Sequence, residues 1–445
     1  TPINSNCPAG TAGATITFDP GVFSSPQTIT LTGSKHISIQ TSVIIIGPGA
    51  RLLSIDAINN SRVFAIDDAL PSNYANVEIY GLNLVKGLAV TPTAFGGAIA
   101  SEENLILGGV RIAQSEARYT DSPPGLAKGG AIAMGVEANL TIYDSLLVSN
   151  QAVTAATDSF AKGGAIYMDG GSLSVENSTL TNNIAAVTGT ASGPAAPAAA
   201  GGAIYLKENG TANISSSTLV DNKSRAQNPS VATGEFESRG GGIVLNGSTF
   251  ADTLTIKHSV LKNQSESTGL ARTVAPDIFY NGGTASADYS YIASATPSVT
   301  ITNAVIGAPL LAALANNGGE TDTISFAFGS SLIDAGDPVV TGLPPFDQRG
   351  PGFPRIFGSR VDIGAFELNS APLPNLSISS ASVAGDNATN PSLNFVVTLS
   401  AVSAVIGCRS QRFHRYLESD GHYSYGYDHC HGVGGSDAGY YCRSH

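Results

Sequence analysis

The chain has 445 residues, no Trp, 51 Gly, 13% charged residues and a net charge of -12. An acidic chain without a basic cluster is not expected to bind nucleic acid. Its longest apolar runs, such as 43–46, are far too short to span a membrane. Because the sequence begins without Met or a signal peptide, we expect a mature chain or a fragment.

The first 90 residues contain short segments that alternate in polarity or are rich in β-branched residues, separated by Gly, Pro and Asn. This pattern predicts strands joined by tight turns. The expected strands are 14–18, 27–31, 36–39, 43–46, 62–66 and 77–80.

A repeat occupies residues 91–270. Gly-Gly followed by an apolar pair occurs at Gly96, Gly129, Gly163, Gly201 and Gly241. Three apolar columns and one polar column recur with it. They are Ile99, Ile132, Ile166, Ile204, Ile243; Leu107, Ile142, Val175, Ile214, Ile256; Ile112, Leu147, Leu180, Leu219, Leu261; and Ser115, Asn150, Asn183, Asn222, Asn263.

These columns predict a β-solenoid. A single copy cannot bury its apolar side, but stacked copies place like residues above like, at about the 4.8 Å spacing of paired strands. The glycine pairs would turn a tight corner, and the Asn column would form a ladder of side-chain amides. We therefore predict an all-β fold of about ten coils over residues 1–310.

The variable part of each repeat lies between the Asn and the next Gly-Gly, at 151–162, 184–200 and 223–239. All three segments would emerge at one corner and form a fringe along the rod. The middle segment is of low complexity, which is typical of a mobile loop. Such insertions often form the working face of a repeat protein.

The repeat resembles the right-handed parallel β-helix proteins of the pectate-lyase-like class. After residue 310 the series Asn317-Gly318-Gly319, 330–336, 347–350 and 362–367 resembles the terminal module of bacterial surface proteins called choice-of-anchor Q. The resemblance implies a secreted or surface-attached bacterial protein without one established activity. We expect 311–370, which opens on a helical turn or a cap at 310–319, to close the end of the solenoid.

Two segments follow. Residues 371–404 resemble the start of a Calx-β sandwich, although Ala384 replaces the acidic residue usual before Gly, so nothing supports a calcium site there. Residues 405–445 hold most of the His and three of the four Cys. Thr and Ala codons read one base out of phase would encode the residue types of 422–432. We therefore expect an out-of-frame, disordered tail rather than a zinc site, because the spacing around Cys430 fits no standard set of ligands.

The residues of mixed charge in the terminal module are the first candidate site. They are Asp347, Arg349, Arg355, Asp362 and Glu367. We expect them to form an ion-pair network that fixes the end of the solenoid, with bidentate Arg contacts; ligand binding is the alternative.

Lys128, Lys162 and Arg239 each stand just before a glycine pair and would stack as a basic stripe suited to an acidic glycan; the alternative is charged residues that flank a turn. The acidic pairs 67–68 and 102–103 are expected to be solvated turn residues, without calcium or another cofactor.

No Ser-His-Asp order, phosphate-binding loop or dinucleotide fingerprint is present. We therefore expect an extracellular structural, adhesive or glycan-binding scaffold that performs no catalysis, with a glycan or a cell-surface partner. The alternative, which rests on fold analogy, is a polysaccharide lyase or glycoside hydrolase.

Overall fold

The computed structural model describes residues 13–70, 74–90, 92, 94–121, 125–189, 198–226, 237–247, 251–267, 272–274, 276–339 and 341–369, together with four strands between 376 and 426. The chain divides into two compact units, Thr1–Asn369 and Ser370–His445. The described residues are all-β and contain no helix, so none is present there that is long and apolar enough to cross a membrane.

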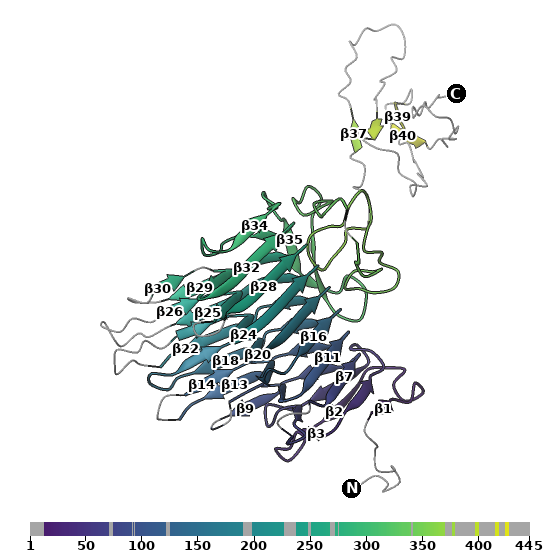
Figure 1. Cartoon of the computed structure of the whole chain (residues 1–445). Coiled ribbons are helices and arrows are strands. Elements are labelled where there is room, and N and C mark those ends of the chain that lie inside the picture. The colour runs from purple at the N-terminus through teal and green to yellow at the C-terminus, as the bar shows by residue number, and fades with distance from the viewer. Residues whose placement is uncertain are drawn as a thin grey trace. The chain divides into compact units, whose positions relative to one another are not determined.

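Two long sheets of parallel strands dominate the first unit (Figure 1). The first has 16 strands. They are β1 (Ala14–Thr17), β3 (Ile37–Ile39), β4 (Val43–Ile46), β6 (Phe64–Ile66), β7 (Asn76–Tyr80), β10 (Ile99–Ser101), β11 (Asn104–Gly108), β15 (Ile132–Val136), β16 (Leu140–Tyr143), β20 (Ile166–Glu176), β24 (Ile204–Ser215), β27 (Ile243–Asn246), β28 (Asp252–Lys257), β31 (Ile278–Tyr280), β32 (Gly283–Asp288) and β34 (Thr300–Thr302).

The second long sheet has 13 strands. They are β2 (Gln27–Thr30), β5 (Leu53–Asp56), β8 (Asn83–Val85), β9 (Leu88–Val90), β12 (Arg111–Ala113), β13 (Glu116–Tyr119), β17 (Leu146–Val148), β18 (Gln151–Thr154), β21 (Thr179–Thr181), β22 (Ile184–Val187), β25 (Thr218–Ala226), β29 (Val260–Ser267) and β33 (Tyr291–Ile292).

The register of these sheets confirms the predicted columns. Ile132 pairs with Ile166, Ile142 with Val175, and Leu147 with Leu180, each one repeat apart. All three columns point inward and form one continuous apolar core. Parallel pairing of successive repeats in two long sheets is the pattern of a β-solenoid, in which each coil covers the apolar side of the next.

The glycine pairs form the predicted corner, but in the last copy the pair lies one residue earlier than predicted. Gly163 has φ 69°, and a Cβ on Gly164 would overlap the carbonyl oxygen of Gly202. In the last copy the equivalent pair is Gly240-Gly241, not the predicted pair that begins at Gly241. Gly242 stands where the other copies have Ala, which is why the sequence allowed either alignment.

The predicted Asn ladder is present and fully buried over most of its length. Asn183 Nδ2 donates to Asn222 Oδ1 at 2.8 Å, and Asn222 Nδ2 donates to Asn263 Oδ1 at 2.9 Å. Asp277, which the repeat did not predict, ends the ladder by accepting from Asn263 N and Nδ2 at 2.6 and 3.0 Å. Burial raises the pKa of this carboxyl to about 6, although its N–H donors act in the opposite direction.

The described parts of the variable segments contain strands. The start of each segment lies in the 13-stranded sheet, as β18, β22 and the end of β25. The end of each segment joins a third, parallel sheet, which consists of β14 (Leu126–Lys128), β19 (Phe160–Lys162), β23 (Ala198–Ala200), β26 (Glu237–Arg239) and β30 (Arg272–Val274). Between this fringe sheet and β18 and β22 lies a small core made mostly of alanines, including Ala152, Ala161 and Ala185. About half of the low-complexity segment predicted to be mobile, 190–197, lies outside the described residues.

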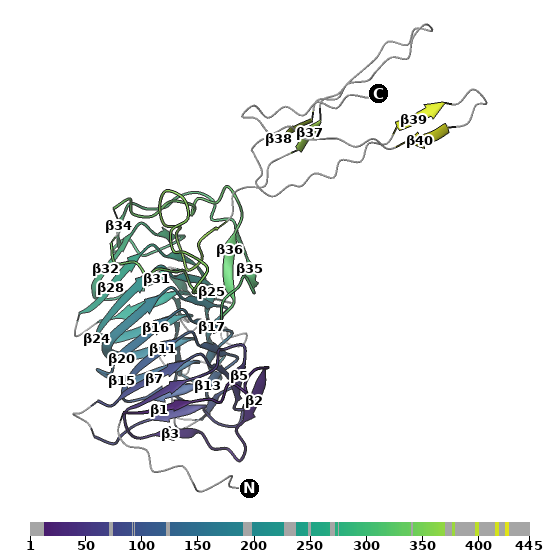
Figure 2. The same cartoon turned by 90° about the vertical axis from the view of Figure 1, so that its right-hand side faces the viewer.

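Residues 311–369, which we call the strap, lie along the flank of the coils rather than only at their end (Figure 2). The expected helical turn is instead strand β35 (Leu311–Ala315), antiparallel to β36 (Thr323–Phe326). Leu314 packs on Ala113, Leu146 and Val148, apolar residues on the outward side of β12 and β17. The strap thus buries an apolar surface that the outward side of these strands presents.

In the second unit, β37 (Leu376–Ile378) and β38 (Val397–Leu399) pair antiparallel and fall within the two segments predicted as Calx-β strands. Farther along, β39 (His414–Leu417) pairs with β40 (Tyr423–Gly426). The rest of the predictions for 371–404 and 405–445 lies outside the described residues.

Candidate functional site

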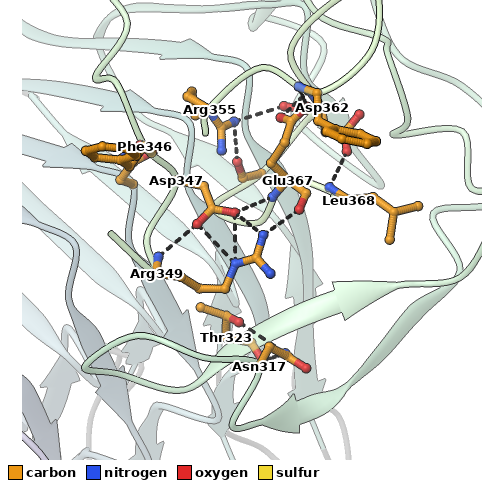
Figure 3. A network of polar contacts seen from close by, with 12 residues as sticks. Asn317, Thr323, Phe346, Asp347, Arg349, Arg355, Asp362, Glu367 and Leu368 are labelled. Carbon is orange, nitrogen blue, oxygen red and sulfur yellow. Dashed lines mark hydrogen bonds and ion pairs between the residues drawn. The ribbon is translucent and has the colours of Figure 1, made fainter. Parts of the chain in front are cut away.

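The five charged residues of the terminal module converge in one network inside the strap (Figure 3). Arg349 makes bidentate contacts with Asp347, with Nη2 at 2.6 Å from Oδ2, and donates to the backbone oxygen of Glu367. Its guanidinium carbon lies 4.0 and 3.9 Å from the ring centroids of Phe353 and Phe366. The guanidinium of Arg349 is thus held by a carboxylate, a backbone carbonyl and two rings, all within the strap.

The other arginine of the network is fully enclosed. Arg355 Nη2 donates to the backbone oxygens of Asp362 and Gly364, at 2.9 and 2.7 Å, while Nε and Nη1 have no hydrogen-bond partner. Burial lowers the pKa of this guanidinium, and the nearby carboxylates of Glu367, Asp347 and Asp362 raise it.

Two carboxyl groups of the network are held by backbone N–H donors. Glu367 Oε1 accepts from Phe357 N and Oε2 from Asp362 N, both at 2.9 Å. Burial raises the pKa of Glu367 to about 8, and the charge of Asp362 adds to this shift against the opposing effect of Arg355. Burial likewise raises the pKa of Asp362 to about 6.

The predicted basic stripe is brought together only in part. Lys128 pairs with Lys162 in the fringe sheet, but Ala200 separates Lys162 from Arg239. The ammonium of Lys128 lies over the rings of Phe95 and Tyr167, 4.4 and 4.6 Å from their centroids.

The other two cations of the stripe also lie on rings. Lys162 lies 4.7 Å from the ring centroid of Tyr205, and Arg239 lies 5.1 Å from that of Phe279. Burial lowers the pKa of Lys162 to about 8, and the neighbouring cations lower it further. The cations of the stripe therefore mainly cover an aromatic column of the 16-stranded sheet.

Carboxylates lie beside this aromatic column. Asp169 Oδ1 accepts from Lys207 Nζ at 2.7 Å, and Asp169 Oδ2 lies 4.0 Å from Lys128 Nζ. Burial raises the pKa of Glu102, and the charges of Asp67 and Asp169 add to that shift. Two acids and a desolvated lysine are thus grouped on one face.

One group of carboxylates in the described part of the chain has oxygens close enough to hold a cation. The ligand oxygens of Asp67, Asp68 and Glu103 lie within 4.8 Å of one another. Glu103 accepts from the backbone N–H groups of Asp68 and Ala75, at 3.0 and 2.5 Å. Glu103 is therefore buried and held by backbone donors, and is not the solvated turn residue that was expected.

A groove of about 580 Å³ runs along the corner where the Asn ladder is buried. It is lined by Asn59, Lys86, Gln114, Glu116, Ser149, Asn150, Gln151, Asn182 and Ile184, of which all but Ile184 have polar side chains. We call it the corner groove. The strap network and the basic stripe contribute no residue to its lining.

One residue from each of four successive coils forms a column in this groove. Lys86, Gln114, Ser149 and Asn182 have φ of 53° to 56°, directly after strand residues that pair in register. The last three side chains are exposed. The same positive φ thus recurs in each coil, and the column repeats at intervals of about 4.8 Å.

Charged groups of the groove are paired within the protein. Lys86 Nζ lies 2.8 Å from Asp56 Oδ2. Glu116 Oε2 accepts from Arg118 Nη2 at 2.7 Å and from Gln151 Nε2 at 3.0 Å. The groups left to a ligand are the amide of Gln114, the hydroxyl of Ser149 and the amide oxygen of Asn182, whose Nδ2 donates to Thr181 Oγ1 at 3.2 Å.

Sequence reasoning missed this groove although a signal was present. In each repeat a polar residue stands directly before the ladder residue, as in Gln114-Ser115, Ser149-Asn150 and Asn182-Asn183. The second residue of each pair is mostly Asn, whereas the first differs in type from copy to copy. The first residue was therefore not recognised as a column. A serine column was missed as well, in which Ser145 N donates to Ser178 Oγ and Ser178 N to Ser217 Oγ, at 3.1 and 3.2 Å.

The chain matches no family model, no curated protein and no solved structure in the comparisons with known proteins.

Proposed function

We propose that this chain is a secreted or cell-surface scaffold that binds an extracellular glycan in the corner groove without cleaving it. In this proposal the solenoid is a right-handed parallel β-helix of about ten coils. The pectate-lyase-like repeat and the choice-of-anchor Q series support the extracellular location.

The observation that carries the proposal is the column of Gln114, Ser149 and Asn182 in the groove. Hydroxyl and amide side chains match the donors and acceptors of sugar hydroxyls. Rigid strands hold them at fixed intervals, so little side-chain and loop ordering is needed on binding.

The composition of the groove favours binding over hydrolysis. Glycoside hydrolases of the usual kind need two carboxyl groups flanking the bond to be cleaved. Of the residues that line the groove, Glu116 alone carries a carboxyl group, and it is held by Arg118 and Gln151.

A glycan array probed with the whole chain tests the proposal. We expect one or more glycans to bind, and the double variant Gln114→Ala/Ser149→Ala to lose at least ten-fold in affinity. Asp221→Ala is the matched control, because Asp221 has the same backbone conformation, with φ 57°, one coil beyond the groove. Equal loss in the control, or no binding by the parent chain, would refute the proposal.

A lyase or hydrolase remains the second candidate because Glu102, Asp169 and Lys128 interact on one face. A desolvated lysine beside carboxylates is the type of group that can accept a proton. Uronate release and new reducing ends, measured over a panel of polysaccharides, test it. We expect neither product; a release that Lys128→Ala abolishes would establish the enzyme instead.

A further inference from the structure

We infer that the ligand of the corner groove is a neutral, linear glycan that lies along the stacking direction of the coils, with about one sugar to each coil. This inference rests on the proposed function and specifies its ligand. It follows from the spacing, the charge and the backbone hydrogen bonding of the groove.

The spacing sets the direction and the length. Lys86, Gln114, Ser149 and Asn182 come from four successive coils, and Asn59 adds one residue from the preceding coil. At about 4.8 Å per coil, the five residues span about 19 Å. A pyranose with its glycosidic bond has a length comparable to one interval, so an extended chain of about four or five sugars would meet each side chain in turn.

The same spacing argues against an extended peptide, whose residues advance by only about 3.3 Å. A peptide would also need free backbone groups if it were to add as a strand. At this corner the N–H groups of Lys86, Gln114 and Ser149 already donate to the carbonyls of the next coil, at 3.1 to 3.2 Å.

The charge of the groove selects a neutral ligand. The one ammonium in its lining, from Lys86, is held by Asp56, and the one carboxylate, from Glu116, is held by Arg118. An acidic sugar would have to compete with Asp56 for the ammonium and would lie near Glu116. The basic stripe predicted for acidic glycans belongs to the fringe sheet and does not line this groove.

The groove has no aromatic residue in its lining, so a sugar ring cannot stack there. Each coil then contributes only hydrogen bonds, which are individually modest in water, about 1 kcal/mol each. Useful affinity must come from several coils acting on one chain. Affinity should therefore increase with the number of sugars until the groove is filled.

Titration calorimetry of the full chain with oligosaccharides of one to six sugars tests the inference. The neutral probes are cello-, manno- and xylo-oligosaccharides, and the acidic probes are oligogalacturonates of the same lengths. We expect at least one neutral series to bind, with affinity rising two- to five-fold per added sugar and levelling off at four or five. Ser149→Ala should weaken the longer neutral oligomers about three- to ten-fold, and Asp221→Ala should leave them unchanged.

Tighter binding of the oligogalacturonates, or affinity that does not depend on length, would overturn the inference while leaving a glycan-binding function in place. Length-dependent binding that Ser149→Ala and Gln114→Ala both leave unchanged would show that the ligand binds to another surface. That result would also overturn the inference. Binding of none of the probes, together with an empty glycan array, would overturn the proposed function and this inference with it.

Discussion

Two kinds of residue, a glycine and an asparagine, each recur at one position of the repeat and join successive coils. Gly164 has no room for a Cβ, because its place is filled by the carbonyl of Gly202 and by backbone atoms of Ile184. Asn183, which is fully buried, joins the coils on both sides through its amide. The residue type that each position allows therefore depends on contacts with the neighbouring coil as much as on contacts within its own repeat.

Replacing Asn183 with Ala should destabilise the first unit strongly. The change removes the acceptor for Asn150 N and Nδ2 and the donor to Leu147 O. Leaving buried polar groups unpaired costs about 1 to 3 kcal/mol for each group, so we expect a loss of about 3 kcal/mol in the free energy of unfolding. Chemical denaturation measures it.

Asn213→Ala is the control for that experiment, because Asn213 is exposed on the 16-stranded sheet and lies outside the ladder. We expect its effect to stay within about 0.5 kcal/mol. If both variants unfolded at the same denaturant concentration, the ladder would contribute no stability.

The inward columns and the ladder could be predicted from the sequence, because similar residues recur at the same position of each repeat: Ile, Leu or Val in the columns and mostly Asn in the ladder. Asp277 shows where that reasoning ends. It completes the ladder with a carboxylate in place of an amide, from a coil too irregular to align. Gln114 and Ser149 were missed because a groove needs only similar polarity, which leaves their residue types free to vary.

Among the elements, the strap differs most from expectation. We predicted a closure at the end of the solenoid, yet its hydrogen bonds reach the early coil of Arg51 as well as Ser145 and Thr218. A signal was present in Leu146-Leu147-Val148, a run that is apolar at every position. A run of this kind indicates a strand covered on both faces, but it does not say which distant segment provides the cover.

Replacing Arg349 with Ala should loosen the strap. The change leaves Asp347, which is fully buried, without its bidentate partner and removes a cation packed between two rings. Breaking a buried pair in this way costs about 3 to 5 kcal/mol. Hydrogen exchange should show faster exchange in 311–369, while Arg360→Ala, an exposed position in the same segment, should change little. Unchanged exchange in Arg349→Ala would contradict the structural role.

The strap should also make stability depend on pH between about 6.5 and 8. Burial raises the folded pKa of Glu367 to about 8 from its ordinary value of 4.5, so the folded state holds a proton that the unfolded state has released. The contribution of this group is complete below pH 4.5 and is lost as the pH rises through 8. The groups that act on Glu367 are Asp362 and Arg355.

Over this window we expect the free energy of unfolding to fall by about 2 kcal/mol as the pH increases. His258 does not interfere, because its folded pKa of about 4 makes it change charge between that value and 6.5. Thermal unfolding at several pH values measures the slope. Glu367→Gln should be less stable at pH 6.5 but show a flatter slope, and a slope as steep as that of the parent chain would assign the effect to another group.

At the scale of the whole molecule, the solenoid core, the ladders, the strap and the corner groove all lie in the first unit. A chain that ends at Asn369 should therefore keep the thermal midpoint of this unit within about 2 °C and bind glycans as the full chain does. Differential scanning calorimetry of both chains, followed by the glycan array, measures this. A drop of 5 °C or more, or loss of binding, would show that the second unit supports the first.

The close contact between the glycines of successive coils limits how this molecule can change in length. The carbonyl of Gly202 occupies the space beside Gly164, and the carbonyl of Gly164 occupies the space beside Gly130, so the distance from coil to coil is fixed at this corner. One residue inserted into a strand would turn its inward side chains outward. Duplication of a complete repeat would preserve the contacts between neighbouring coils and extend the corner groove by one more interval. The length of the corner groove can thus change only by complete coils.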